Sequence, residues 1–327
     1  MTFMVALLIS CASNDKTKEP GETTKEPCEH TYEESIASPA MPLKDGVKLF
    51  TCSKCQDNYT EAIPMTKSLK ILAIGNSFSS DAMEYLWDLC KQGGVETLVT
   101  GNLYYGGATL DVQYDCIKKN SASYTYYKNT DGVWNSTKNT KPKNVFADEE
   151  WDIITVQQGS GSSGIPSTYS KLGEIIELIS EANPTAKIYW HMTWAYQQNS
   201  THNEFPKYDS DQKTMYSKIV NTVKSTVLPF EQICGVVPVG TAIQNLRSSY
   251  VGDTITRDGY HLNYYAGRYT AAMTWYAYFT GADVDTMEWV PSTVETKVRK
   301  DLDAIKESVK NAIEKPYEAT QSTFTER

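Results

Sequence analysis

Short apolar runs alternate with helical stripes from residue 69 onward, and this alternation restricts the fold more than any other feature. Four runs have the length of buried strands, at residues 69–74, 153–156, 187–192 and 235–239, and a further strand is expected at 96–103. Strands that are apolar on both faces and separated by helices form a parallel sheet with helices on each side. The sequence therefore predicts an α/β protein over residues 69–315, built as a three-layer α/β/α sandwich with a parallel sheet.

The helices are predicted from apolar residues three and four positions apart. The stripes are Met83, Leu86, Trp87 and Cys90; Leu172, Ile175, Ile176 and Ile179; Met215, Ile219 and Val223; and Val294, Val298, Leu302, Ile305 and Val309. Another helix is expected at 264–280. Asp81 and Glu84 have the spacing of a capping box for the first helix, which Gly93 and Gly94 should end. The sequence does not indicate what the polar, tyrosine-rich stretch 111–150 covers, and residues 316–327 are expected to form a tail.

The first 27 residues have the pattern of an export signal followed by a tether. Residues 3–9 are apolar and lead into Ser10 and Cys11, and residues 8–11 resemble a bacterial lipobox, whose cysteine becomes lipidated. Residues 12–27 are charged and proline-rich, which predicts a flexible segment. No lysine or arginine precedes the apolar run, so a cytosolic N-terminus is the alternative. We expect an exported, lipid-anchored protein at the cell surface or in the periplasm, with the anchor as its only membrane contact.

Residues 28–65 form a small Cys/His unit of a different character. Cys28 and His30 precede Cys52 and Cys55, and four such ligands in two close pairs suit tetrahedral zinc. A unit of this size needs a metal or a disulfide in order to fold. The stretch resembles a short Cys/His repeat of bacterial surface proteins. We expect a structural zinc in this unit, and a disulfide is the alternative, because export favours oxidation.

A serine follows the first predicted strand directly, in Gly75-Asn76-Ser77-Phe78-Ser79. At a strand end next to a helix N-terminus, a hydroxyl projects from the sheet beside free backbone N–H groups. An activated serine needs a histidine and an acid. His30 belongs to the Cys/His unit, His202 is expected in solvent and His191 in the core. His261 has Asp258 three residues before it, so that a carboxylate can bond its ring.

Together these motifs identify a resemblance to the SGNH (GDSL-like) hydrolases. The motifs are GNSFS, Gly106-Gly107-Ala108-Thr109, VQQGS, TWAY, VPVGTA and RDGYHL, within residues 69–281, and they resemble a bacterial branch of that family. The resemblance implies a flavodoxin-like fold with Ser77 as nucleophile, His261 as base and Asp258 as its partner. It also implies an oxyanion hole from the N–H groups of Ser77 and Gly107. The family's third donor, an asparagine, is missing here, and we expect the Gln158 amide in its place.

The predicted function is that of an exported serine esterase that uses an acyl-enzyme and no cofactor for catalysis. Aromatic residues near the site, export and the resemblance favour a carbohydrate O-acetylesterase, with Trp194 and Tyr196 contacting the substrate. The alternatives are an esterase, lipase or acyltransferase acting on another ester, and a glycan- or surface-binding lipoprotein without turnover. The net charge of -9 argues against nucleic acid as a partner. Cys90 and Cys234 are expected in the core, and a disulfide between Cys90 and Cys116 is an alternative.

Overall fold

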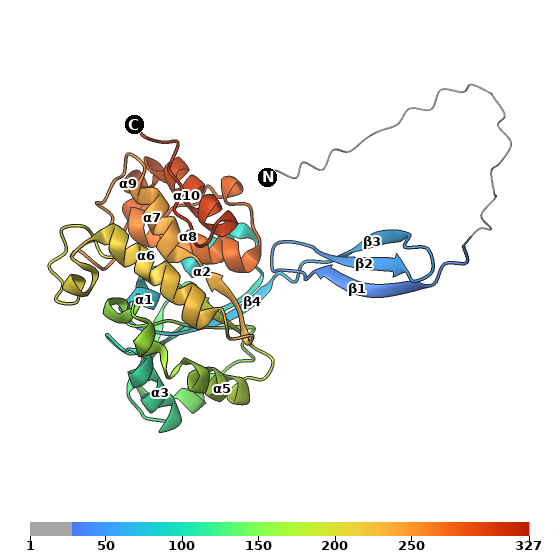
Figure 1. The fold of residues 1–327 in the computed structure, drawn as a ribbon, viewed down its shortest axis with the longest axis horizontal. Helices are drawn as coiled ribbons and strands as arrows, with labels where there is room; N and C mark the ends of the chain where they lie inside the picture. The colour runs from blue at the N-terminus through green and yellow to red at the C-terminus, as the bar shows by residue number, and fades with distance from the viewer. Residues whose placement is uncertain (1–27, 327) are drawn as a thin grey trace.

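The computed structural model describes residues 28–326, which form two sheets. A three-stranded sheet extends away from a larger body built on seven strands (Figure 1). The predicted signal, the lipobox Cys11 and the tether 12–27 lie outside the described residues. Within residues 28–326, no helix has both the length and the apolar character that crossing a membrane requires.

The elements have the following bounds. The strands are β1 (Tyr32–Ser38), β2 (Gly46–Cys52), β3 (Asn58–Ile63), β4 (Ser68–Gly75), β5 (Thr97–Tyr104), β6 (Tyr124–Asn129), β7 (Asn135–Thr140), β8 (Ile153–Val156), β9 (Lys187–His191) and β10 (Ile233–Val237). The α-helices are α1 (Ser77–Met83), α2 (Leu86–Gly93), α3 (Leu110–Lys118), α4 (Pro142–Phe146), α5 (Leu172–Ala182), α6 (Gln212–Thr222), α7 (Val239–Arg247), α8 (Ala266–Thr280), α9 (Glu295–Arg299) and α10 (Leu302–Glu314). Short 3₁₀ or π turns are η1 (Ser160–Ser162), η2 (Pro166–Tyr169), η3 (Phe205–Tyr208), η4 (Val223–Val227), η5 (Val284–Thr286) and η6 (Ser292–Val294).

The large sheet has the order β10-β9-β8-β4-β5-β6-β7. Its first five members are parallel, and the pairs β5–β6 and β6–β7 are antiparallel. In chain order the parallel strands run 2-1-3-4-5, which is the flavodoxin-like arrangement. The predicted α/β sandwich is therefore confirmed, and the two antiparallel strands from the stretch 111–150 make the sheet mixed.

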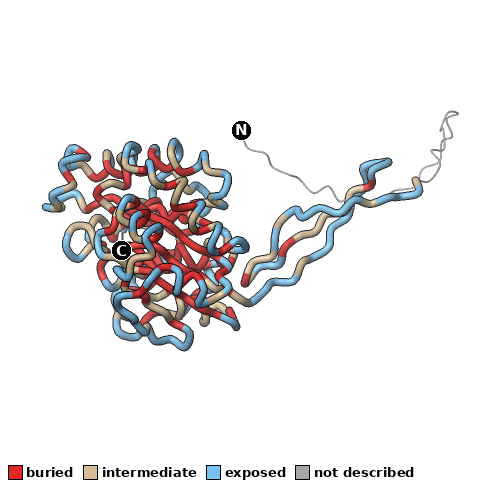
Figure 2. The backbone as a smooth tube through the Cα atoms, turned by 90° about the horizontal axis from the view of Figure 1, so that it is seen from below, coloured by how far each residue is buried: buried red, intermediate tan, exposed pale blue. Residues whose placement is uncertain are grey.

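Helices cover both faces of this sheet, and the core lies between them. In Figure 1, α3 and α5 lie on one side, and α7, α8 and α10 lie together on the other. The strands β4 and β8 are buried on both faces, as their apolar sequences require. Figure 2 shows buried backbone through the middle of the large body, with exposed segments around it. This rigid double-sided core fixes the carboxyl ends of the parallel strands, where ligands bind in such folds.

Several local predictions need correction. The first helix begins at Ser77 with Asn76 as N-cap, so Asp81 lies inside α1 and forms no capping box with Glu84. The stripe 294–313 is divided between η6, α9 and α10. Cys90 is buried as expected, but Cys234 is exposed, because β10 is the edge strand of the sheet.

The C-terminal segment packs against the body. Oδ1 of Asn245 on α7 accepts from the backbone N–H of Thr320 at 2.7 Å, and the carbonyl of Phe324 accepts from Tyr250 at 2.8 Å. Ser322 is buried. The described residues beyond 315 therefore form part of the folded unit.

Candidate active site

Ser77 lies at the junction between the central strand β4 and helix α1. The strand ends at Gly75, and Asn76 caps the helix by accepting from the backbone N–H of Phe78 at 3.0 Å. The order of the parallel strands reverses at β4, between β5 and β8. Ser77 is thus held at the crevice where doubly wound sheets bind their ligands.

The structure brings Ser77, His261 and Asp258 into one hydrogen-bonded chain. Oγ of Ser77 lies 2.7 Å from Nε2 of His261, and Nδ1 of His261 lies 2.7 Å from Oδ2 of Asp258. Oδ1 of Asp258 also accepts from the backbone N–H of His261 at 2.8 Å. When Nδ1 donates to the carboxylate, Nε2 is free to accept the serine proton. The arrangement can therefore activate Ser77 as a nucleophile.

The ionisation of Asp258 suits this arrangement. Burial acts to raise the pKa of Asp258, but hydrogen bonds from the ring and backbone of His261 outweigh it and hold the pKa below its usual value. The carboxylate therefore stays charged at neutral pH, where it stabilises the imidazolium that forms when His261 takes a proton.

Asp81 anchors the loop that carries His261 to the helix that carries Ser77. Its carboxylate is buried, with 1% of the side chain exposed, and accepts from the backbone N–H of Leu262 at 2.8 Å. The guanidinium groups of Arg257 and Arg268 pair with it at 3.1 and 2.6 Å. The sequence did not indicate this role, because the spacing from Asp81 to Glu84 favoured a cap.

A cavity of about 500 Å³ opens in front of Ser77 and His261. Gly107 lines it with a φ of +69°, a conformation that glycine adopts without strain. Ser77 is the first residue of α1, so its N–H has no acceptor within the helix. Both predicted backbone donors therefore border the space where an ester carbonyl would develop negative charge.

Gln158 does not supply the third oxyanion donor. Its Nε2 donates to the carbonyl and the hydroxyl of Thr168, at 2.9 and 3.1 Å. The residue is 1% exposed and does not line the cavity. Its Oε1 accepts from the backbone N–H groups of Leu110 and Gly159. Among the described residues that line the cavity, the one side-chain amide belongs to Asn76.

Trp194 and Tyr196 are both fully buried, so the predicted contact with substrate is wrong. Trp194 stacks on Phe78 with ring centroids 4.2 Å apart and donates to the carbonyl of Tyr260 at 2.8 Å. The hydroxyl of Tyr196 contacts Ser160 from behind the cavity wall. Both rings contact Tyr260, in the loop that carries His261, and neither lines the cavity.

His202 lines the cavity, although the sequence placed it in solvent. Its ring packs against Tyr260 with centroids 4.5 Å apart, and Nδ1 accepts from the backbone N–H of Glu204 at 3.2 Å. Burial lowers the pKa of His202, which favours the neutral ring. No local motif marks this residue, because the path of the loop between β9 and η3 brings it to the site.

The Cys/His unit gathers a second cluster at the end of the three-stranded sheet. Ligand atoms of Cys28, His30, Cys52 and Cys55 all lie within 4.8 Å of one another. Sγ of Cys28 is 4.0 Å from that of Cys52, and Sγ of Cys55 is 3.3 Å from Nδ1 of His30. Tetrahedral zinc with bonds of about 2.0–2.3 Å places its ligands at similar separations. The four residues therefore fit such an ion.

Backbone donors reinforce that fit. Burial acts to raise the pKa of the Cys52 thiol, but backbone N–H groups, those of Lys54 and Thr31 foremost, outweigh it and lower the pKa to about 5. The neighbouring Cys28 shifts the other way: its hydrogen bond with Cys55, together with burial, raises its pKa to about 11. A thiolate at neutral pH is the form that binds metal.

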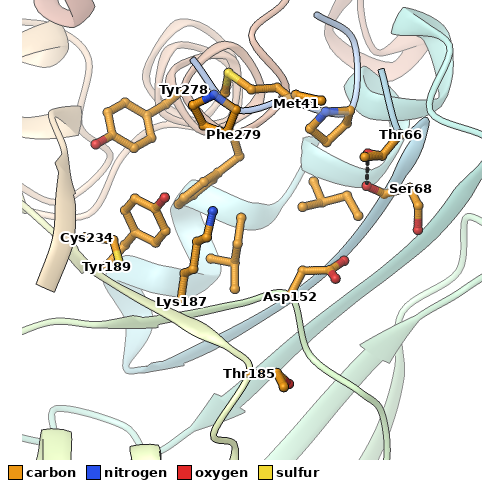
Figure 3. Close-up of a pocket in the computed structure, with 15 residues that line it drawn as sticks. Met41, Thr66, Ser68, Asp152, Thr185, Lys187, Tyr189, Cys234, Tyr278 and Phe279 are labelled. Carbon is orange, nitrogen blue, oxygen red and sulfur yellow. Dashed lines mark hydrogen bonds between the residues drawn. The ribbon is translucent and has the colours of Figure 1, made fainter. Parts of the chain in front are cut away.

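Another cavity, of about 490 Å³, lies at the amino ends of the strands, opposite the candidate active site (Figure 3). Residues at the beginnings of strands line it, among them Ser68 and Lys187, together with Met41 from the base of the three-stranded unit. It contains none of the residues around Ser77, so it is separate from the candidate active site.

Solved structures with a similar fold include proteins of known and unknown activity. A crystal structure of a DUF4886 family protein from Bacteroides uniformis has 38% sequence identity, a TM-score of 0.75, and coverage of 79% of this chain and 100% of that one. A Slackia heliotrinireducens protein assigned to the SGNH hydrolases has 18% identity, a TM-score of 0.41 and coverage of 66% and 100%. A peptidoglycan O-acetylesterase has 10% identity, a TM-score of 0.32 and coverage of 71% and 92%.

A protein assigned to the SGNH hydrolases is thus among these matches. No curated protein matches the chain. Residues 70–309, most of the chain, match the family described as a domain of unknown function, DUF4886. With that match and the Bacteroides uniformis relative, the chain belongs to the DUF4886 family.

Proposed function

We propose that this protein is a serine esterase that removes acetyl or similarly small acyl groups from a carbohydrate. The observation that carries the proposal is the chain from Ser77 through His261 to Asp258, with 2.7 Å at both links. A binding protein gains nothing from a carboxylate that orients a histidine toward a serine. An esterase requires all three groups.

In the proposed reaction, Oγ of Ser77 attacks the carbonyl carbon of the ester while Nε2 of His261 takes the hydroxyl proton. The backbone N–H groups of Ser77 and Gly107 stabilise the resulting oxyanion. The tetrahedral intermediate collapses, the C–O bond to the sugar breaks, and His261 returns the proton to the sugar oxygen. Water then attacks the acyl-enzyme by the same route, releasing the carboxylic acid and free Ser77.

The lining of the cavity supports a small acyl group and a polar leaving group. It consists of glycine, serine, threonine, tyrosine, histidine, asparagine and glutamate, and no described lining residue is aliphatic. A long acyl chain would bury little apolar surface there. Sugar hydroxyls would find partners in Ser160, Ser162 and Glu204. The proposal thus favours an acetylated glycan over a lipid ester.

Two further parts of the proposal concern the N-terminal region. We propose a structural zinc ion bound by Cys28, His30, Cys52 and Cys55, whose role is to hold the ends of the three-stranded sheet together. We also propose export and lipid anchoring at Cys11, on the basis of the sequence of residues 1–11.

Fluorophosphonate labelling tests the nucleophile. These reagents modify activated serines, so we expect one adduct, located on Ser77 by peptide mapping. Ser79 and Ser80 lie in the same peptide and serve as internal controls that should stay unmodified. His261→Ala should reduce the labelling rate at least 1,000-fold, since the base is lost.

Failure to label a folded protein would favour the binding-only alternative. For the substrate class, kcat/KM for 4-nitrophenyl acetate should exceed that for 4-nitrophenyl decanoate at least tenfold. The reverse order would favour a lipase. Acetate release from acetylated oligosaccharides then tests the carbohydrate part directly.

A further inference from the structure

The hairpin formed by β6 and β7 borders a further cavity beside the candidate active site. This cavity has a volume of about 320 Å³, and its lining residues come from α1, β5 and the hairpin: Ser80, Met83, Glu84, Asn102, Tyr127 and Trp134. Three of these side chains are apolar or aromatic, and three are polar. The stretch 111–150, whose purpose the sequence did not indicate, supplies Tyr127 and Trp134.

Helix α1 connects this cavity to Ser77. Ser77, Ser80 and Glu84 are three and four residues apart, a spacing that places them on one face of a helical segment. With a rise of 1.5 Å per residue, Ser80 lies about 5 Å and Met83 about 9 Å along the axis from Ser77. The rings of Tyr104, which lines the active-site cavity, and Tyr127 meet edge to face with centroids 5.8 Å apart. The two cavities are therefore neighbours.

The loop that carries Trp134 has a defined shape. The backbone N–H of Gly132 donates to Oδ1 of the buried Asn129 at 2.8 Å. Gly132 has a φ of +97°, and the loop packs against the ring of Trp87 on α2. A loop that is already ordered loses little entropy when a ligand binds.

We propose that this cavity beside the active site is a glycan subsite, which holds a sugar ring next to the sugar ring that carries the acyl group. A pyranose has C–H faces that pack on Tyr127 and Trp134, and hydroxyls that need polar partners. Arg268 pairs with Oε2 of Glu84 at 2.9 Å, which leaves Oε1 to accept from a hydroxyl. Ser80 accepts from Nδ2 of Asn102 at 3.2 Å, so its own O–H can donate.

An acyl chain suits this cavity less well than a sugar ring. It would cover Oε1 of Glu84 and the hydroxyl of Ser80 without offering hydrogen bonds, and unpaired polar groups cost free energy when they are desolvated. The subsite rests on the proposed carbohydrate esterase function and explains what the hairpin contributes to it. It predicts that the protein prefers acetylated oligosaccharides to acetylated monosaccharides.

The test compares chain length at constant chemistry. Xylose and xylotriose that carry one acetyl ester at the same hydroxyl differ only in the neighbouring rings. The chitin-derived series, N-acetylglucosamine and its trimer with one O-acetyl ester at the same hydroxyl, provides a second pair. We expect kcat/KM of the full chain to be at least tenfold higher for the trisaccharide in one series. Trp134→Ala should reduce that preference about tenfold, and Trp134→Leu, which keeps apolar bulk over Met83, should reduce it similarly.

Val133→Ala is the matched control, because Val133 neighbours Trp134 but is 60% exposed and outside the cavity lining. It should retain the trisaccharide preference. A wild-type protein without any preference in either series, or a Trp134→Leu variant that keeps it, would overturn the subsite while the esterase function stands. Cleavage of 4-nitrophenyl acetate without activity on any acetylated sugar would instead refute the carbohydrate function, and the subsite with it.

Discussion

Asn76 illustrates how one side chain organises the residues around Ser77. Its Oδ1 accepts from the backbone N–H of Phe78 and from Nε2 of Gln157, and its Nδ2 donates to the carbonyl of Ala108 at 3.0 Å. An aspartate in its place could accept but could not donate to Ala108. The amide thus ties the nucleophile turn to the loop that carries Gly107.

Asp81 allows a direct test of positioning. The Asp81→Asn substitution removes the buried negative charge that pairs with the partly exposed guanidinium groups of Arg257 and Arg268. We expect a loss of about 2 kcal/mol in the free energy of unfolding, since the buried amide nitrogen cannot accept from the donors that the carboxylate satisfied. A loop shift of about 1 Å would lower kcat for 4-nitrophenyl acetate about 100-fold. Urea unfolding and initial rates measure the two effects.

Asp115→Asn is the matched control for Asp81→Asn. Asp115 pairs with Lys119 at 2.9 Å on the exposed surface of α3, where such pairs contribute about 1 kcal/mol or less. A merely structural role for Asp81 would lower stability and leave kcat of the remaining folded protein unchanged, and that result would contradict positioning.

The triad could be predicted from the sequence, and its surroundings could not. Ser77 and His261 lie in short motifs whose place after a strand fixes where the side chain points. Gln158, Trp194 and Tyr196 follow strands as well, but each turns into the protein because Thr168, Phe78 or Ser160 offers it a partner. His202 reaches the cavity through a loop whose path no periodicity records.

At the scale of elements, the strands that are apolar on both faces were predictable, whereas the hairpin was not. The strands β4 and β8 are covered by helices, so all their positions are apolar except Ser68, Lys70 and Thr155. In contrast, β7 reads NSTKNT, and its first five positions are exposed. Because the first five positions of β7 are exposed, no buried face imposes alternation on its sequence, which is polar and typical of a loop.

The Cys/His unit permits a prediction at the same scale. Most positions of β1 and β3 are exposed, so these strands bury little apolar surface. We therefore expect metal binding to supply the stability of this small sheet. The purified protein should contain one zinc ion per chain by elemental analysis. Cys52→Ser should abolish it, and hydrogen exchange of β1 to β3 should rise at least tenfold without a change in the large sheet.

Cys234→Ser serves as the control for the metal prediction, because Cys234 is an exposed thiol far from the four ligands in the chain. This variant should keep the zinc. The alternative is a disulfide. Purified protein that contains no metal and has a disulfide between Cys28 and Cys52 would establish it and refute the zinc site.

For the whole molecule, the two ends of the large sheet differ in what they contact: one borders the candidate active site and the other the small unit. The candidate active-site cavity lies at the carboxyl ends of the strands. Residues 39–44 of the small unit contact the amino ends of the strands and the end of α8, where the backbone N–H of Leu43 donates to the carbonyl of Thr280 at 2.9 Å. The Bacteroides uniformis relative is matched along its full length by 79% of this chain, so it folds without an equivalent of the remainder.

Removal of residues 1–65 should therefore leave the esterase intact. We expect kcat/KM for 4-nitrophenyl acetate within about twofold of the full chain, because no described residue before 68 lines the catalytic cavity. The melting temperature should fall by about 2–4 °C, the effect of about 1 kcal/mol in a protein of this size. A loss of activity greater than tenfold in a folded variant would show that the small unit takes part in catalysis.

His191 links the core of the molecule to its stability against acid. It ends β9, is fully buried, and has uncharged neighbours: Gln157, whose Oε1 lies 3.1 Å from its Nδ1, and the rings of Trp194 and Trp275. Burial lowers its pKa to about 3 from the ordinary value of 6.5. Between these values the unfolded chain binds a proton that the folded protein does not bind.

The free energy of unfolding should therefore fall as the pH decreases from about 6.5 toward 3, since unfolding takes up a proton at His191. For one proton the maximum slope is about 1.4 kcal/mol for each pH unit. His191→Gln carries no titrating group, so the difference in stability between the wild-type protein and this variant should narrow by about that amount per unit. Urea unfolding at pH 7, 5.5 and 4.5 measures it. Parallel pH profiles would mean that the folded protein accommodates a charged His191, which these neutral neighbours give it no means to do.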